Sequence, residues 1–342
     1  MKKKSFYILL IFVAVILLTY LTGESYYRGI IEKAGLDKKT EKIYQYKYDM
    51  IVDSPDSQFW QAVYTSAKKT AADNNVLLEI MGTDRSAAYD KLDYMNMSIA
   101  SKVDGIILQY NGENGLEQAI NSAENSGIPV VTVMSDAVHS GRQSFVGVSD
   151  YQLGMAYGEI VARYVDKDTK KILILQKRDI DDMNESQIYT QISNAAQEAA
   201  GTEEISIKGR NLLSTGTFET EEAVTDIFQQ RHNIPDILVC MDEETTECAR
   251  QAVLDFNLAG KVKIIGYYIS EDILAAVEKG VISATCDMDT TQLGQYSVEA
   301  LTNYIKDGRT NSFYNVDINF LDREAVQKMR REAGTDEKTP VA

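Results

Sequence analysis

Acidic and aromatic side chains stand at the ends of several apolar segments of this sequence. Asp136 follows one β-branched segment, Asp242 follows another, and the aromatic pair Phe59 and Trp60 opens a stretch with helical spacing. A carboxylate can accept hydrogen bonds from hydroxyl groups or pair with an amine, and an aromatic ring can cover the apolar face of a ligand. These residue types therefore indicate a site for a small molecule.

Each candidate also has a purely structural alternative. Aspartate is a preferred helix N-cap, so Asp150 and Asp242 could serve mainly as caps. Trp60, the sole tryptophan, could pack in the core instead of stacking on a ligand.

An enzyme is a further alternative. Asp136 with Asp242 or Asp287 would supply the two carboxylates of a glycosidase. The sequence contains no common nucleophile, metallopeptidase or phosphate-loop motif, and we expect binding and not catalysis.

Composition limits the possible partners. The net charge of −16 argues against binding to nucleic acid, which requires a basic face. The three cysteines, Cys240, Cys248 and Cys286, are odd in number and lack the spacing of a metal site. His139 and His232 are far apart in the sequence and have no ligand spacing. We expect no cofactor and no metal.

The N-terminus predicts export. Three lysines at positions 2–4 precede an uncharged run over residues 5–23, close to the ~20 apolar residues that span a bilayer. A cleaved signal peptide and an uncleaved signal-anchor both fit, but the run is followed by no small-residue cleavage site and no lipid-accepting cysteine. We expect residues 1–23 to anchor the protein in the lipid bilayer of the cell membrane as a single-pass transmembrane helix, with the body outside. Cleavage would instead give a secreted protein.

Beyond a spacer over residues 24–47, strands and helices alternate. In the first half, strands are predicted at 50–52, 76–81, 105–108, 130–133 and 145–148, with helices at 57–74, 86–101 and 116–126. In the second half, a first helix is predicted to follow Gly154 and to end at residue 165. Further helices are predicted at 186–200, 217–230, 245–256, 271–279 and 291–305. Strands are predicted at 172–175, 205–207, 237–240, 263–266, 282–286 and 316–320. This α/β alternation predicts two doubly wound, Rossmann-like lobes with parallel sheets.

The repeat also sets boundaries. We assign residues 48–149 and 289–316 to an N-terminal lobe, 150–288 and 317–322 to a C-terminal lobe, and 323–342 to a charged, frayed tail. The chain is expected to cross between the lobes near Ser149, Gly266 and Asp289. Because parallel sheets bind ligands at the carboxyl ends of their strands, the site should lie between the lobes.

Motifs spread along residues 48 to about 320 carry a family resemblance. They are SPDSQFW, VDGIIL, IPVVTVMSD, FVGVSDYQLG, PDILVCMDEET, KIIGYYISEDILAAVEKGVISAT and TQLGQYSVEAL. Together these motifs resemble the type I periplasmic binding proteins of the ribose-binding and autoinducer-binding group. The resemblance implies a solute-binding cleft, three hinge crossings and closure on ligand. LacI-type repressors share the fold, but this chain has an apolar segment in place of their DNA-binding helices.

The resemblance also implies which residues face the ligand. They are Ser57, Phe59, Trp60, Met134, Asp136, Asp150, Tyr151, Gln187, Met241, Asp242, Tyr268 and Met288. Several are methionine or tyrosine where sugar-binding members usually carry polar residues. None of them is an obviously basic side chain. An unpaired buried polar group costs about 1–3 kcal/mol, so such a cleft would satisfy a plain hexose poorly. The family favours a carbohydrate-like ligand, and the residues also suit a partly apolar or cationic one.

A membrane partner follows from the expected anchor. A body fixed near the membrane suits a sensor histidine kinase, whereas the resemblance equally admits the permease of an ABC transporter. Both alternatives remain open at the level of the sequence.

Overall fold

The computed structural model describes residues 17–20, 22–24, 43–82, 89–177, 186–201, 204–212, 217–230 and 233–336. The chain divides into two units, Met1–Tyr44 and Gln45–Ala342. In the described part of the first unit, residues 17–20 and 22–24 are helical. No helix among the described residues is long and apolar enough to cross a membrane. Most of the predicted anchor and of the spacer lies outside the described residues.

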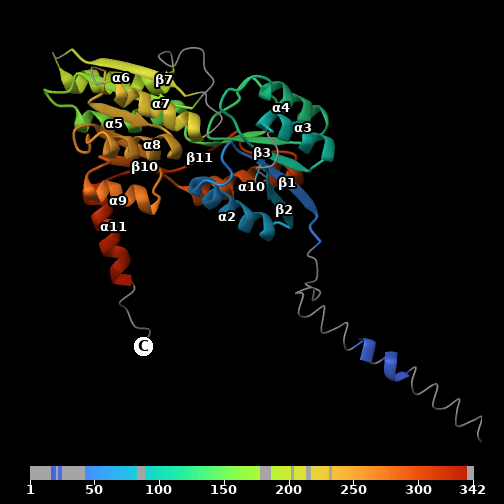
Figure 1. The fold of residues 1–342 in the computed structure, drawn as a ribbon. Coiled ribbons are helices and arrows are strands. Elements are labelled where there is room, and N and C mark those ends of the chain that lie inside the picture. The colour runs from blue at the N-terminus through green and yellow to red at the C-terminus, as the bar shows by residue number, and fades with distance from the viewer. Residues whose placement is uncertain are drawn as a thin grey trace, which may run out of the picture. The chain divides into compact units, whose positions relative to one another are not determined.

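The N-terminal lobe is built on a parallel sheet of six strands in the order β11-β5-β4-β3-β1-β2 (Figure 1). These strands are β1 (Tyr46–Ile51), β2 (Val76–Ile80), β3 (Gly105–Gln109), β4 (Val130–Val133), β5 (Ser144–Gly147) and β11 (Phe313–Asn315). Every residue of β4 and β5 is buried, as expected for strands covered on both faces. The helices of this lobe are α2 (Gln58–Asp73), α3 (Lys91–Ser101), α4 (Leu116–Asn125) and α10 (Thr290–Asp307). The predicted spacer is therefore too long by two residues, because β1 begins at Tyr46.

The C-terminal lobe repeats this plan in the order β12-β10-β9-β8-β6-β7. Its strands are β6 (Lys171–Gln176), β7 (Ser206–Asn211), β8 (Ile237–Cys240), β9 (Lys263–Tyr267), β10 (Ala284–Met288) and β12 (Ile318–Asp322). All pairs are parallel except β12, which runs antiparallel to β10. The helices are α5 (Asp150–Tyr164), α6 (Gln187–Ala200), α7 (Thr217–Gln229), α8 (Glu243–Asp255), α9 (Glu271–Lys279) and α11 (Arg323–Asp336). Two α/β lobes are thus confirmed.

The chain passes between the sheets after β5, after β10 and between β11 and β12. Backbone hydrogen bonds tie these segments together: Val316 N donates to Gly147 O at 2.9 Å, and Asp289 N donates to Asp317 O at 3.0 Å. The predicted crossing near Gly266 is wrong, because Gly266 lies inside β9. A side chain there would come within 2.5 Å of the Thr246 side chain on α8, so close packing explains this glycine.

The predicted frayed tail is also wrong for residues 323–336, which form α11. Val326 is buried, and Met329, one turn later, packs against the same apolar cluster. Arg330 forms ion pairs with Glu271 (2.9 Å) and Glu278 (3.0 Å) of α9. The many charges of this segment belong to its exposed face, and two apolar residues are enough to dock it.

Candidate functional site

Aromatic side chains join the two lobes where the carboxyl ends of their strands meet. Phe59 lies in the first turn of α2, Tyr267 ends β9, and Tyr268 follows it. The ring centroid of Phe59 lies 5.5 Å from that of Tyr267 and 5.5 Å from that of Tyr268, with interplanar angles of 58° and 90°. Trp60 meets Phe59 edge-on at 5.1 Å. The predicted residues Phe59 and Tyr268 therefore do lie together, whereas Tyr267 was not predicted.

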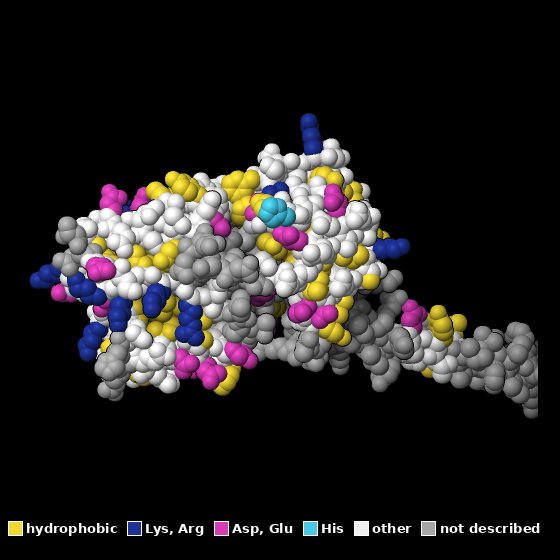
Figure 2. All heavy atoms as spheres, turned by 90° about the horizontal axis from the view of Figure 1, so that it is seen from above, with side chains coloured by type: hydrophobic (Ala, Val, Ile, Leu, Met, Phe, Trp, Pro, Cys, Tyr) yellow, Lys and Arg dark blue, Asp and Glu magenta, His cyan; other side chains and the backbone are white. Residues whose placement is uncertain are grey.

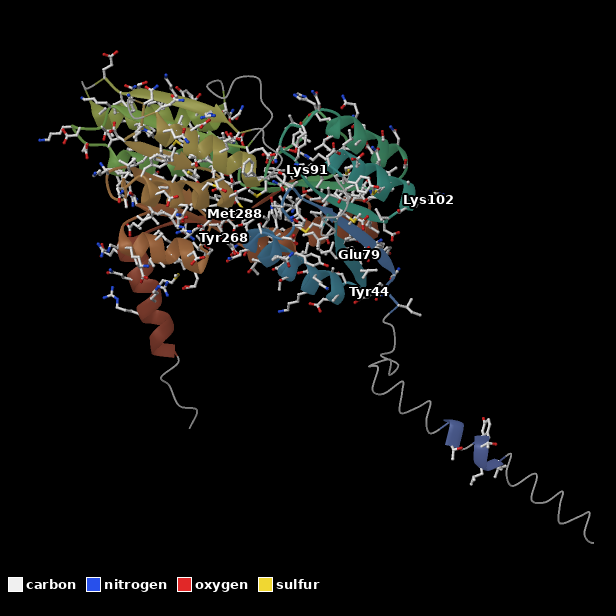
Figure 3. All side chains as sticks on the ribbon, viewed as in Figure 1. Tyr44, Glu79, Lys91, Lys102, Tyr268 and Met288 are labelled. Carbon is white, nitrogen blue, oxygen red and sulfur yellow. The ribbon has the colours of Figure 1, made fainter. Side chains whose placement is uncertain are left out.

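Two methionines flank the Tyr267 hydroxyl. Its oxygen lies 3.3 Å from Sδ of Met288, which ends β10, and 4.0 Å from Sδ of Met134, which follows β4. Tyr268 and Met288 lie at the junction of the lobes in Figure 3. We call Phe59, Met134, Tyr267, Tyr268 and Met288 the cross-lobe cluster.

A carboxylate reaches across the same junction. Glu243, the first residue of α8, accepts a hydrogen bond from the backbone N–H of Phe59 at 3.1 Å. Burial raises the pKa of the Glu243 carboxyl, and the Phe59 N–H opposes this rise. The sequence pointed to its neighbour Asp242, which instead caps α8 by accepting from the backbone N–H and hydroxyl of Thr245, both at 2.9 Å. Burial likewise raises the pKa of Asp242.

Asp136 is engaged within its own lobe. Arg142 holds it with two parallel bonds, Nε to Oδ1 at 2.5 Å and Nη2 to Oδ2 at 2.6 Å, and donates a third to Ser312 O at 3.3 Å. Such a fork is the strongest geometry for this ion pair. Arg142, which was not among the predicted residues, therefore already occupies the Asp136 carboxylate.

A buried lysine lies at the N-terminal lobe's carboxyl edge. Lys91, at the start of α3, is 8% exposed, and its Nζ pairs with Asp53 at 2.7 Å and with Glu113. Asn111 donates to Asp53 at 2.6 Å. Asp53 and Asn111 follow β1 and β3, so this group supplies polar donors and acceptors at the strand ends; Figure 3 labels Lys91. None of these residues was predicted, because their proximity depends on strand order.

A second pair occupies the facing edge of the other sheet. Lys177, which follows β6, pairs with Glu244 in the first turn of α8. β6 and β8 are neighbours in the C-terminal sheet, just as β1 and β3 are neighbours in the N-terminal sheet. Each lobe therefore places a lysine–acid group at the carboxyl ends of corresponding strands.

The remaining predicted residues lie as follows. Ser57 caps α2 by accepting from Trp60 N at 3.2 Å, and Met241 packs partly buried against the core. Asp150 lies in the first turn of α5, whose N-cap is Ser149. Tyr151 is 53% exposed and Gln187 is exposed at the start of α6. On the face in Figure 2, hydrophobic side chains reach the surface in small groups separated by polar and charged residues.

Asp287 should make the stability of the protein depend on pH. Burial, and next the negative charge of Asp289, raise the pKa of Asp287 from 3.8 to about 6. An acid whose pKa is raised on folding favours the folded state below its unfolded pKa, and this contribution is lost as the pH rises through the folded pKa. In the wild type, we expect the free energy of unfolding to fall by about 1–2 kcal/mol between pH 4 and 6 because of Asp287, a value discounted for partial exposure. Asp287→Asn should abolish this fall.

Urea unfolding at several pH values measures this. Asp255→Asn, at an exposed position of α8, is the control and should keep the pH dependence of the wild type. Identical pH profiles for wild type and Asp287→Asn would contradict the prediction.

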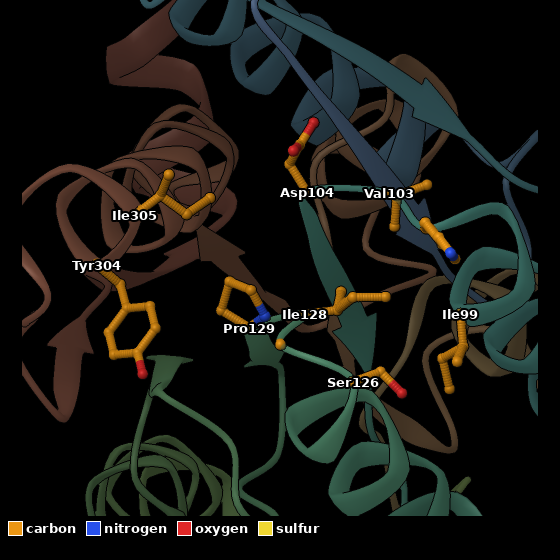
Figure 4. Close-up of a pocket in the computed structure, with 10 residues that line it drawn as sticks. Ile99, Val103, Asp104, Ser126, Ile128, Pro129, Tyr304 and Ile305 are labelled. Carbon is orange, nitrogen blue, oxygen red and sulfur yellow. The ribbon is translucent and has the colours of Figure 1, made fainter.

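A surface pocket of about 600 Å³ lies elsewhere, at the amino ends of β3 and β4 (Figure 4). Asp104 and Pro129, which precede these strands, line it together with Tyr304 and Ile305 of α10. Asp104 already accepts the backbone N–H of Lys47 at 2.8 Å. Among the described residues, no group of His, Cys, Asp and Glu is placed to hold a metal ion. The junction of the lobes therefore remains the candidate site.

Comparisons with known proteins agree with the two-lobed fold. Residues 48–310 match the family described as periplasmic binding protein domain. The ABC transporter periplasmic-binding protein YphF of Escherichia coli (strain K12) is 20% identical over 69% of this chain and 73% of its own length. GanP, a glucose-galactose binding protein from Geobacillus stearothermophilus, is 21% identical with a TM-score of 0.68, over 82% of this chain and 98% of its own. A chain of the XylFII-LytSN complex is 22% identical with a TM-score of 0.67, over 82% of this chain and 98% of its own length.

Proposed function

Because the chain belongs to the periplasmic binding protein domain family, we propose that it binds a small, carbohydrate-like solute between its lobes, outside the cytoplasm. The observation that carries this proposal is the convergence of Phe59, Tyr267 and Tyr268 at the carboxyl ends of the strands. Ligands of open α/β sheets bind at such ends. The naming of GanP as a glucose-galactose binding protein supports the ligand class.

The junction offers both kinds of contact that a carbohydrate uses. Aromatic rings can cover the apolar face of a sugar, and Phe59 and Tyr268 would supply them. The group of Lys91, Asp53 and Asn111 offers charged donors and acceptors for hydroxyl groups. Ligand-facing roles for Met134, Met241 and Met288 belong to the same proposal.

A partly apolar or cationic ligand is the second candidate. The observation in its favour is that Met134 and Met288 bracket Tyr267 at the junction and that Glu243 lies beside Phe59. Thioether and aromatic groups adapt to apolar ligands, and aromatic faces attract cations.

We propose binding and not turnover. A glycosidase needs one carboxyl group free to donate a proton and one free to attack or activate water. Asp136 is held by Arg142, and Asp242 accepts two hydrogen bonds from Thr245. These engagements favour a binding protein.

The partner is proposed to be a membrane protein. YphF carries the name of an ABC transporter component, which favours a permease. XylFII occurs in a complex with LytSN, which favours a protein partner of another kind, and a sensor histidine kinase is our second candidate. Residues 1–23 would keep the body beside either one as a signal-anchor. N-terminal sequencing of the exported protein tests the anchor, and a chain beginning near Glu24 would exclude it.

A thermal-shift screen of residues 45–342 tests the ligand class. Hexoses, pentoses, cyclitols and small amines are each added at increasing concentration, and a ligand at 100 times its Kd should stabilise by about 2.7 kcal/mol. We expect a sugar or cyclitol to raise Tm by about 5 °C or more, and Phe59→Ala to abolish the shift. A shift with amines alone would favour the second candidate, and consumption of the ligand would indicate an enzyme.

A further inference from the structure

We propose that the lobes hold each other closed through a lock of their own side chains, so that closure does not require a ligand. The lock consists of the cross-lobe cluster and the Glu243 carboxylate. It goes beyond the proposed function, which concerns only what enters the cleft.

The aromatic part of the lock removes one ring of each lobe from water. Phe59 of α2 is 4% exposed and Tyr267 of β9 is 3% exposed, although Phe59 lies in the first turn of its helix and Tyr267 is the last residue of its strand. Both Phe59 contacts, with Tyr267 and with Tyr268, are made with the opposite lobe. Opening the lobes would expose these faces, and the hydrophobic effect opposes that exposure.

The polar part of the lock uses the start of α2. The first N–H groups of a helix lack partners within the helix. Ser57 accepts one of them, from Trp60, and Glu243 of the opposite lobe accepts another, from Phe59. A carboxylate at a helix N-terminus is favoured by the helix dipole as well as by the bond itself. One helix end is therefore capped from both lobes.

Backbone strain indicates that the cross-lobe contacts are a built feature. Met134 and Tyr268 have φ values of 72° and 73°, a left-handed conformation that is uncommon outside glycine. Each follows the third strand in the order of its own sheet, β4 and β9 respectively. Met134 contacts Tyr267 and Tyr268 contacts Phe59, each across the junction. Conformations that cost free energy persist where the surroundings compensate for them. Within its own lobe, Tyr268 donates its N–H to Cys286 O and its carbonyl accepts from the Thr285 hydroxyl, both at 2.7 Å, and the ring contact with Phe59 of the opposite lobe adds to these bonds.

The lock changes what a ligand can do. A ligand shifts a two-state equilibrium only through its different affinities for the two states. If the closed state already predominates, binding produces little further closure. A ligand would instead have to displace the contact between Phe59 and Tyr268.

Tyr268→Gly tests the aromatic part with little risk to folding. Glycine adopts the left-handed conformation without steric strain, so the substitution removes the ring and also relieves the backbone strain at this position. The control is Asn257→Gly, which makes the same change at an exposed left-handed residue (φ 56°) away from the junction. Glu243→Ala tests the polar part, and Glu271→Ala, at the first position of α9, is its control.

Closure is measured with no added ligand, by small-angle scattering and by single-molecule energy transfer between two dyes. The dyes are attached to cysteines introduced by Gln118→Cys on the N-terminal lobe and Lys279→Cys on the C-terminal lobe. Cys248→Ser removes the partly exposed native cysteine. We expect wild type and both controls to be mainly closed. Tyr268→Gly should shift the closed-to-open ratio about tenfold toward open, and Glu243→Ala should shift it in the same direction. A mainly open wild type, or variants with an unchanged ratio, would overturn the proposal. Because no ligand is used, this result is independent of the thermal-shift screen.

Discussion

Replacement of Trp60 by alanine is expected to lower the free energy of unfolding by about 3–5 kcal/mol. Trp60 is 5% exposed and belongs to the apolar core that also contains Val63 and Leu293. It packs edge-on against Phe59, and its removal would leave a cavity under the first turn of α2. Phe59 also contacts Tyr267 and Tyr268 of the opposite lobe, whereas the ring contact of Trp60 is with Phe59 of its own helix, so its burial favours the core alternative for Trp60 over stacking on a ligand. Urea unfolding followed by circular dichroism measures the loss without relying on tryptophan fluorescence.

The control for Trp60 is Phe218→Ala, because Phe218 is 73% exposed on α7. Truncation of an exposed side chain should change the free energy of unfolding by no more than about 0.5 kcal/mol. If Trp60→Ala lost less than about 1 kcal/mol and yet failed to bind the ligand found by the screen, Trp60 would be a ligand-stacking residue and the core assignment would be wrong.

Much of the fold could be predicted because buried strands and capped helices leave local patterns. The predicted bounds of β4 and α9 agree with the structure, since a β-branched run marks the one and Ser270 and Gly280 delimit the other. β11 was missed because its three residues carry no periodicity and its position depends on pairing with β5, far away in the sequence.

The site was predictable only in part. Residues that follow strands directly, such as Met134 and Tyr268, could be found because strand ends mark the cleft edge. Arg142, Lys91 and Glu243 could not, since their roles depend on tertiary contacts with Asp136, Asp53 and Phe59. Asp242 and Glu243 illustrate this. Both acids lie at the start of α8, and only the three-dimensional structure shows that Asp242 caps the helix and that Glu243 accepts a hydrogen bond from Phe59 of the opposite lobe.

Gly294→Ala is expected to lower the free energy of unfolding by about 2–3 kcal/mol, even though alanine favours helix formation. At Gly294, α10 crosses α2 so closely that a Cβ atom would lie 2.3 Å from Val63 O and 2.8 Å from Ala67 N. Both are backbone atoms, so the clash can be relieved only by moving one helix away from the other. α2 carries Phe59, and α10 begins directly after a crossing between the lobes, so the displacement should also disturb the junction.

Gly141→Ala is the matched control for Gly294. A Cβ atom there would meet the carboxyl end of the Glu124 side chain, which can rotate away, so a loss of less than about 1 kcal/mol is expected. Urea unfolding of wild type and both variants gives the comparison. A Gly294→Ala protein as stable as the wild type would mean that α2 and α10 can separate at little cost. The position of Phe59 would then not depend on the packing of these two helices, and the junction would have to be held by the cross-lobe contacts alone.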